Sequence, residues 1–167
     1  MKIYKNFFST ELLYSVEKDL NRNLNENTWN AGSLLIWNSG LKHGVTGNCL
    51  SSLVSENVKT KLCEKLLTVF PKYENISVMY QIWHPHSGIS MHDDGSYKFG
   101  ATIYLNDDWD INWGGLFIWE DNLTKKLNVL FPSKNTLVLN DKSERHMVTT
   151  VSPLAQKIRK TIQIFAK

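Results

Sequence analysis

From Asn75 to its last residue, the chain is a series of short β-rich segments separated by turn-forming residues. Valine, isoleucine, threonine and aromatic residues dominate these segments, and each segment is too short for an ordinary helix. They span residues 76–83, 99–105, 116–119, 127–131, 136–139, 146–151 and 159–165. Many short strands at this spacing are typical of a two-sheet sandwich or barrel, so the sequence predicts a mainly β core.

Two segments before this region have helical periodicity. Ser9 or Thr10 can cap a first helix, in which apolar residues recur at helical spacing as far as Leu20. A second helix is expected from about Ser55 to Val69. Each helix has one apolar stripe, so both should cover the outer face of a sheet. Between them, residues 34–37 predict a strand, and the glycine-containing segment 38–48 predicts a loop that we regard as a candidate substrate lid.

The length of 167 residues suits one domain. We therefore expect a single domain over 1–167, with helical support over about 1–75 and a β core over about 76–167. The formal net charge of +3 is small and the lysines are scattered, so no nucleic-acid surface is indicated. No segment has the length and apolarity of a membrane span, and the N-terminal apolar run is too short for a signal peptide. A cytoplasmic protein is expected, with its oligomeric state left open.

One group of residues indicates metal chemistry. His92 and Asp94 stand at positions i and i+2, which share one face of an extended segment. Imidazole nitrogen and carboxylate oxygen together suit a borderline divalent metal, and a third ligand from a distant strand would complete a triad on one face of an octahedron. His146 is the candidate for that third ligand. Such a triad leaves the opposite coordination positions open for a chelating cosubstrate and O2.

Simpler interpretations compete with each part of this pattern. An isolated His-x-Asp is common on protein surfaces, so the pair has weight only together with His146. His84 and His86 could suggest a cupin metal motif, but no glutamate follows at the spacing that such a motif needs, and we interpret both as loop histidines. Tyr80 could face either the core or a pocket. The four tryptophans of the β region, Trp83, Trp109, Trp113 and Trp119, are expected to serve mainly core packing.

The second half of the chain resembles the prolyl 4-hydroxylase-like branch of the Fe(II)- and 2-oxoglutarate-dependent oxygenases. The resemblance covers roughly Ser77 to Phe165 and rests on an ordered set of motifs. These are His92-x-Asp94, Ala101-Thr-Ile-Tyr-Leu-Asn106, Trp113-Gly-Gly-Leu-Phe117, Phe131-Pro132, His146 and Arg159-Lys-Thr-Ile-Gln-Ile-Phe165. The His-x-Asp motif alone is weak, whereas the ordered set is specific.

The resemblance implies a double-stranded β-helix, or jelly roll, with N-terminal helices against the larger sheet. It also implies that His92, Asp94 and His146 hold Fe(II), with O2 as a further reactant and ascorbate as an optional supporting reductant. Arg159 stands where relatives carry the basic residue that binds the remote carboxylate of 2-oxoglutarate, helped by Tyr104 and Thr161. A guanidinium suits this task because its planar pair of donors matches a carboxylate.

The chain departs from the family pattern in two places. The interval from His146 to Arg159 is longer than usual, which makes Lys157 a rival anchor for 2-oxoglutarate. We prefer Arg159 because the β-branched and aromatic run that follows it matches the final strand of the family. Asn135 stands where relatives often carry a turn glycine, and asparagine tolerates the left-handed backbone that such a turn needs.

The resemblance further implies hydroxylation of an unactivated C–H bond. Halogenating relatives lack the carboxylate that Asp94 supplies, and nucleic-acid demethylases carry a second arginine where this chain has Phe165. A prolyl side chain of a peptide or protein is the first expectation for the substrate, and a lysyl side chain is the second. A free amino acid or small metabolite is the alternative, and a non-catalytic jelly-roll binding module is the alternative of another class.

Overall fold

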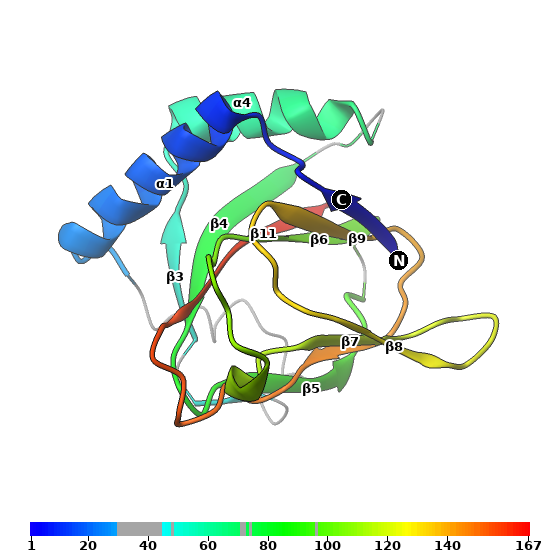
Figure 1. Ribbon diagram of the computed structural model, residues 1–167. Coiled ribbons are helices and arrows are strands. Elements are labelled where there is room, and N and C mark those ends of the chain that lie inside the picture. The colour runs from blue at the N-terminus through cyan, green and yellow to red at the C-terminus, as the bar shows by residue number, and fades with distance from the viewer. Residues whose placement is uncertain (30–44, 48, 71–72, 74, 96) are drawn as a thin grey trace.

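The computed structural model describes residues 1–29, 45–47, 49–70, 73, 75–95 and 97–167 (Figure 1). The strand expected at 34–37 and most of the loop expected at 38–48 lie outside these residues. Within the described part of that loop, residues 45–46 form a short strand, because they pair with Ile89 and Gly88. The expectation of an unstructured loop is therefore wrong at this point.

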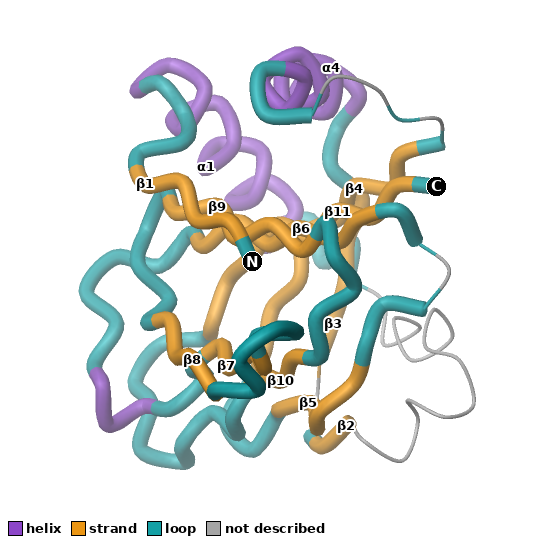
Figure 2. The backbone as a smooth tube through the Cα atoms, turned by 90° about the vertical axis from the view of Figure 1, so that its right-hand side faces the viewer, coloured by secondary structure: helices purple, strands orange, loops and turns teal. Residues whose placement is uncertain are grey.

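Two antiparallel sheets face each other (Figures 1 and 2). The larger sheet consists, in spatial order, of β1 (Lys2–Lys5), β9 (Thr136–Asn140), β6 (Phe99–Tyr104), β11 (Arg159–Ala166), β4 (Ile76–Trp83) and β3 (Cys49–Leu53). The smaller sheet consists of β2 (Val45–Thr46), β5 (Gly88–His92), β10 (His146–Val148), β7 (Phe117–Glu120) and β8 (Leu127–Leu130). This arrangement confirms the predicted double-stranded β-helix.

Two helices cover the outer face of the larger sheet, as predicted (Figure 2). Helix α1 (Thr10–Asn25) begins at Ser9, whose side chain accepts a hydrogen bond from the backbone N–H of Leu12. Such a cap satisfies one of the N–H groups that the first turn leaves without a helical partner. Helix α4 (Glu56–Leu67) begins after Ser55. Buried side chains of both helices join one hydrophobic core with the outward-facing residues of β4, β6, β9 and β11.

Strand β11 shows how the larger sheet separates the core beneath the helices from the space between the two sheets. Successive side chains of a strand point to opposite faces. Ile162 and Ile164 belong to the core beneath the helices, whereas Arg159 and Thr161 have the opposite parity and face the smaller sheet. Tyr80 on β4 belongs to the helix side, and its hydroxyl donates to the carbonyl of Val16. Its position resolves the earlier alternative in favour of the core.

A second core fills the space between the two sheets. Trp83, Trp109 and Trp119 are buried in it, and Trp113 is partly buried against it. Their packing agrees with the predicted structural role. The short 3-10 helix η1 (Ile111–Trp113) precedes β7, and Asn135, in the turn before β9, has a φ of +57°.

The expected division at about residue 76 needs a correction. Strands β1 and β3 come from the first 75 residues, yet they form the two edges of the larger sheet. Strand β1 is four residues long and contains two lysines, so its sequence carries no clear strand signal, and its pairing with β9 decides its structure. None of the helices in the described part of the chain is long and apolar enough to cross a membrane.

Candidate metal and cosubstrate site

The three predicted metal ligands lie together at the smaller sheet. His92 ends β5 and His146 begins β10, and the antiparallel register places the two residues directly opposite each other. Asp94 follows two residues after His92, in the turn that leaves β5. One ligand atom from each side chain lies within 4.8 Å of the other two. The His146 Nε2 and Asp94 Oδ1 atoms are 3.6 Å apart, and the centroids of the two imidazole rings are 4.4 Å apart.

Backbone carbonyls determine which nitrogen of each imidazole carries its proton. The Nδ1 atom of His92 lies 2.7 Å from the carbonyl oxygen of Ser90, and the Nδ1 atom of His146 lies 3.0 Å from that of Glu144. Since a carbonyl oxygen only accepts, each Nδ1 donates, and the neutral ring then presents a lone pair at Nε2. Hydrogen bonds of this kind orient histidines that bind metals.

Burial keeps both rings neutral. It lowers the pKa of His92, with a further lowering from the neighbouring His146. It also lowers the pKa of His146 to about 4. The contact between His146 and Asp94 is therefore not an ion pair at neutral pH, but an approach of a nitrogen lone pair to a carboxylate oxygen. Three such acceptors so close together repel one another unless a cation lies between them, so this donor set fits a divalent metal.

A glycine on the opposite sheet makes room for the carboxylate. Gly100 on β6 is buried, and a Cβ atom at this position would collide with the Asp94 Oδ2 atom. Any side chain here would have to displace Asp94 from His146. The larger sheet therefore limits where the carboxylate can lie, although it contributes none of the three side chains.

The predicted cosubstrate residues form a second group, on the larger sheet. Arg159 and Thr161 share the inner face of β11, and Tyr104 on β6 is the register partner of Thr161. All three are buried, Arg159 to 1% exposure. The Arg159 Nη2, Tyr104 hydroxyl and Thr161 Oγ1 atoms have no partner at hydrogen-bond geometry among the described residues, although Tyr104 lies near enough to Arg159 to offset part of the lowering of its pKa by burial. Leaving buried polar groups unpaired is costly, so this cluster fits a ligand rich in acceptor atoms, such as a carboxylate.

The guanidinium of Arg159 is held in place by its surroundings. Its Nε atom donates to the carbonyl of Gly115 at 2.9 Å. The guanidinium carbon lies over the ring of Tyr104, 5.2 Å from the ring centroid, and 5.7 Å from the ring of Trp83. Burial lowers the pKa of Arg159 from its ordinary value, but a guanidinium remains protonated at neutral pH. The site therefore contains a buried positive charge with an unpaired donor.

The structure separates Arg159 from its rival, Lys157. The Lys157 side chain is exposed, and its Nζ atom donates to the backbone carbonyl of Asp107 at 3.4 Å. It is therefore a surface residue of the connection before β11. This geometry supports Arg159 as the anchor.

Sequence reasoning missed several residues that shape the site. Asn140 ends β9 beside the triad, and a cavity of about 10 Å³ between Asn140, Asp94 and His146 has room for about one water molecule. Tyr97 and Phe165 stack at a centroid distance of 4.7 Å, and the backbone N–H of Tyr97 donates to the Asp94 carbonyl. Only Phe165 lay in a motif already noted. The importance of the others depends on strand pairing, which no local pattern reveals.

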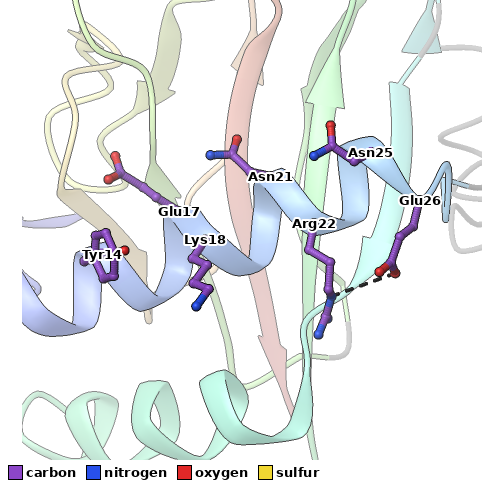
Figure 3. Close-up of a pocket in the computed structure, with 7 residues that line it drawn as sticks. All are labelled: Tyr14, Glu17, Lys18, Asn21, Arg22, Asn25 and Glu26. Carbon is purple, nitrogen blue, oxygen red and sulfur yellow. Dashed lines mark ion pairs between the residues drawn. The ribbon is translucent and has the colours of Figure 1, made fainter.

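A separate hollow lies along the exposed side of α1 (Figure 3). Its lining is polar, and Arg22 and Glu26 form an ion pair there with a separation of 3.9 Å. Helix α1 covers the outer face of the larger sheet, whereas the triad and Arg159 lie on the inner side. His84 and His86, in the turn between β4 and β5, also lie outside the triad, as expected.

No family model and no curated protein matches the sequence. The fold, however, is similar to those of solved oxygenase structures. One is a prolyl hydroxylase from Trichoplax adhaerens, solved in complex with a peptide fragment of the hypoxia inducible factor oxygen degradation domain. Its TM-score is 0.80 at 16% sequence identity, and the match covers 99% of this chain and 82% of that protein. A Pseudomonas putida prolyl-4-hydroxylase has a TM-score of 0.73 at 14% identity, with coverages of 99% and 91%.

A viral collagen prolyl hydroxylase from Paramecium Bursaria Chlorella virus-1, solved with 2-oxoglutarate, has a TM-score of 0.60 at 13% identity, with coverages of 99% and 94%. At such low identities the likeness concerns the fold alone. The resemblance stated from the sequence motifs is thereby confirmed at the level of the fold.

Proposed function

We propose that this chain, which has the fold of prolyl hydroxylases, is an Fe(II)- and 2-oxoglutarate-dependent dioxygenase that hydroxylates an unactivated C–H bond. The observation that carries the proposal is the convergence of two neutral imidazoles and one carboxylate within 4.8 Å, with no donor among their ligand atoms. Two nitrogen ligands and one oxygen ligand suit Fe(II) and leave room for further ligands. The unpaired donors around Arg159 support the dependence on 2-oxoglutarate.

Each side chain then has a defined task. His92, Asp94 and His146 would hold the metal. Arg159, Tyr104 and Thr161 would bind the remote carboxylate of 2-oxoglutarate and neutralise its charge. When bound, Fe(II) and 2-oxoglutarate supply the oxidation: 2-oxoglutarate and O2 become succinate and CO2, and one oxygen atom of O2 enters the substrate as a hydroxyl group. The aromatic residues between the sheets, including Trp83 and Phe117, would exclude water from this chemistry.

The metal and cosubstrate can be tested together. Anaerobic addition of Fe(II) and 2-oxoglutarate should produce a weak visible charge-transfer band, and admission of air should produce succinate. Asp94→Ala should abolish both, because it removes the only oxygen ligand of the triad. Asp93→Ala is the matched control, since this neighbouring carboxylate is exposed and accepts a hydrogen bond from Gly95 N–H at 3.0 Å in the turn. No band and no succinate with folded wild-type protein would refute the proposal and favour a non-catalytic binding module.

For the substrate, we propose a prolyl side chain of a peptide or protein. The Tyr97–Phe165 stack is half-buried beside Asp94 and offers an apolar surface that suits an uncharged ring. Lys167 Nζ already lies 5.9 Å from the centroid of the Tyr97 ring, and its charge disfavours a lysyl ammonium at the same place. A related fold binds a peptide fragment, which is consistent with a peptide substrate here.

A comparison of candidate substrates tests this proposal. Proline-containing peptides, lysine-containing peptides and free amino acids should each be incubated with the enzyme, Fe(II), 2-oxoglutarate, ascorbate and air. Mass spectrometry should find an added oxygen atom in the proline-containing peptides, and Asp94→Ala should yield none. If oxygen is added only to free amino acids, the proposed substrate is a free amino acid or small metabolite and not a peptide.

A further inference from the structure

Asn140 connects two of the three metal ligands without being a ligand itself. It is the last residue of β9 in the larger sheet, and six residues later the chain enters β10 in the smaller sheet at His146. Its register partner in β6 is Gly100, the residue that leaves room for the Asp94 carboxylate. Asn140 is only 5% exposed, so its amide must find its partners inside the protein.

The amide of Asn140 holds the backbone of Glu144, whose carbonyl orients His146. Its Oδ1 atom accepts from the backbone N–H of Glu144 at 2.9 Å, and its Nδ2 atom donates to the Glu144 carbonyl at 2.9 Å. The same carbonyl accepts the Nδ1 proton of His146 at 3.0 Å. Asn140 Nδ2 itself lies 3.4 Å from His146 Nδ1. The side chain thus fixes the acceptor that points the Nε2 lone pair of His146 toward Asp94.

Asn140 also lies near the Asp94 carboxylate, since its register partner Gly100 directly adjoins Asp94 Oδ2. Asn140 also lines the small cavity beside Asp94 and His146. One amide therefore contacts the surroundings of one imidazole and one carboxylate that come from different segments of the chain.

We propose that Asn140 is a positioning residue that aligns Asp94 and His146 for binding a divalent metal; this inference rests on the metal site of the proposed function. Residues that orient metal ligands typically contribute a factor of about 10–100 to metal affinity. A side chain that merely closes the 141–145 connection would contribute to stability and leave the metal affinity unchanged. The two roles are therefore distinguishable.

Co(II) titration of the metal-free protein, followed by its visible absorption and without 2-oxoglutarate, measures the affinity directly. Asn140→Ala should weaken Co(II) binding at least about tenfold. Asn23→Ala is the matched control. Asn23 is a similarly buried amide on the helix side of the sheet, and its Nδ2 atom donates to Ser52 Oγ at 3.0 Å and to the Leu53 carbonyl at 2.8 Å. This variant should lower the melting temperature while leaving the Co(II) dissociation constant within about twofold of the wild type.

The outcomes separate the two proposals. If wild-type protein binds Co(II) and Asn140→Ala binds it equally well, or if Asn23→Ala weakens binding as much, the role of Asn140 is refuted and the metal site stands. If folded wild-type protein binds no Co(II), both proposals fail.

A measurement on the wild type covers the case in which Asn140→Ala does not fold. Side-chain amide protons can be followed by NMR as Zn(II), a diamagnetic metal, is added. Those of Asn140 should exchange with solvent more slowly once the metal fixes their partners, and those of Asn23 should not change. Unchanged exchange at Asn140 with saturating Zn(II) would refute the positioning role.

Discussion

At the scale of single residues, Gly115 determines where the guanidinium of Arg159 can lie. Its carbonyl accepts from Arg159 Nε, its φ is +64°, and an added Cβ atom would lie 2.8 Å from Arg159 Cδ and 3.3 Å from Nε. Only glycine combines the left-handed backbone with this close approach. Gly115, the second glycine of the Gly-Gly pair in the sequence motif, thus fixes the position of the proposed 2-oxoglutarate anchor.

We expect Gly115→Ala to weaken 2-oxoglutarate binding at least about tenfold, equivalent to about 1.4 kcal/mol, because the methyl group displaces Arg159. Gly95→Ala is the matched control, since Gly95 has a φ of +60° but an added Cβ would meet no described atom within 4 Å. Both variants should lose about 1–2 kcal/mol of stability from the left-handed backbone. Isothermal titration with 2-oxoglutarate in the presence of Mn(II) would measure the difference, and equal affinities in the two variants would contradict the steric argument.

At the scale of elements, β11 serves the core on one face and the site on the other. Ile164 is fully buried beneath the helices, while Arg159 and Thr161 face the smaller sheet. The alternation of side chains along a strand makes this possible, because each face of the sheet has its own neighbours. Stability and cosubstrate binding should therefore be separable within a single strand.

We predict that Ile164→Ala lowers the free energy of unfolding by about 2–5 kcal/mol, as is usual for a cavity in a core, and leaves the 2-oxoglutarate affinity unchanged. Arg159→Ala should instead weaken 2-oxoglutarate binding by about 2–5 kcal/mol, the usual cost of removing one partner of a desolvated charge pair. Lys157→Ala, at the exposed end of the preceding connection, should change neither quantity. Denaturant unfolding and cosubstrate titration test the three variants, and a larger binding loss in Lys157→Ala would move the anchor to Lys157.

At the scale of the whole molecule, the two halves of the proposed site lie on different sheets. The proposed metal ligands belong to β5, β10 and the turn after β5, whereas Arg159, Thr161 and Tyr104 belong to β11 and β6. A cosubstrate held by both groups would link the sheets. Its binding should therefore depend on the metal and stabilise the native state.

With Mn(II), which does not support turnover, 2-oxoglutarate at about 100 times its dissociation constant should stabilise the fold by about 2.7 kcal/mol. For a chain of this size, each kcal/mol corresponds to a shift of about 2–4 °C in melting temperature. The shift should be much smaller without Mn(II) and in Asp94→Ala. Equal stabilisation of the wild type by 2-oxoglutarate with and without metal would show that Arg159 binds the cosubstrate independently of the triad.

The sequence by itself determined the features that depend on local patterns. The helices at α1 and α4 followed from apolar spacing, the β11 strand from its β-branched residues, and the left-handed turn at Asn135 from the tolerance of asparagine. Apart from β5, which was not predicted, the strands of the β region were predicted within three residues of their observed ends. The sequence also predicted that His92 and Asp94 lie close together, although β5 ends at His92 and Asp94 lies beyond the strand and not on its face.

Only the tertiary structure decided the features that depend on which distant segments become neighbours. In the structure, β1 and β3 form the edges of the larger sheet, and Tyr80 lies under the helices. Arg159 is buried, whereas Lys157 is exposed. The tertiary structure also brought Asn140 beside Asp94 and His146. Periodicity reports which face of its own element a residue occupies, whereas the identity of the group opposite is set by strand register and sheet packing across long stretches of chain.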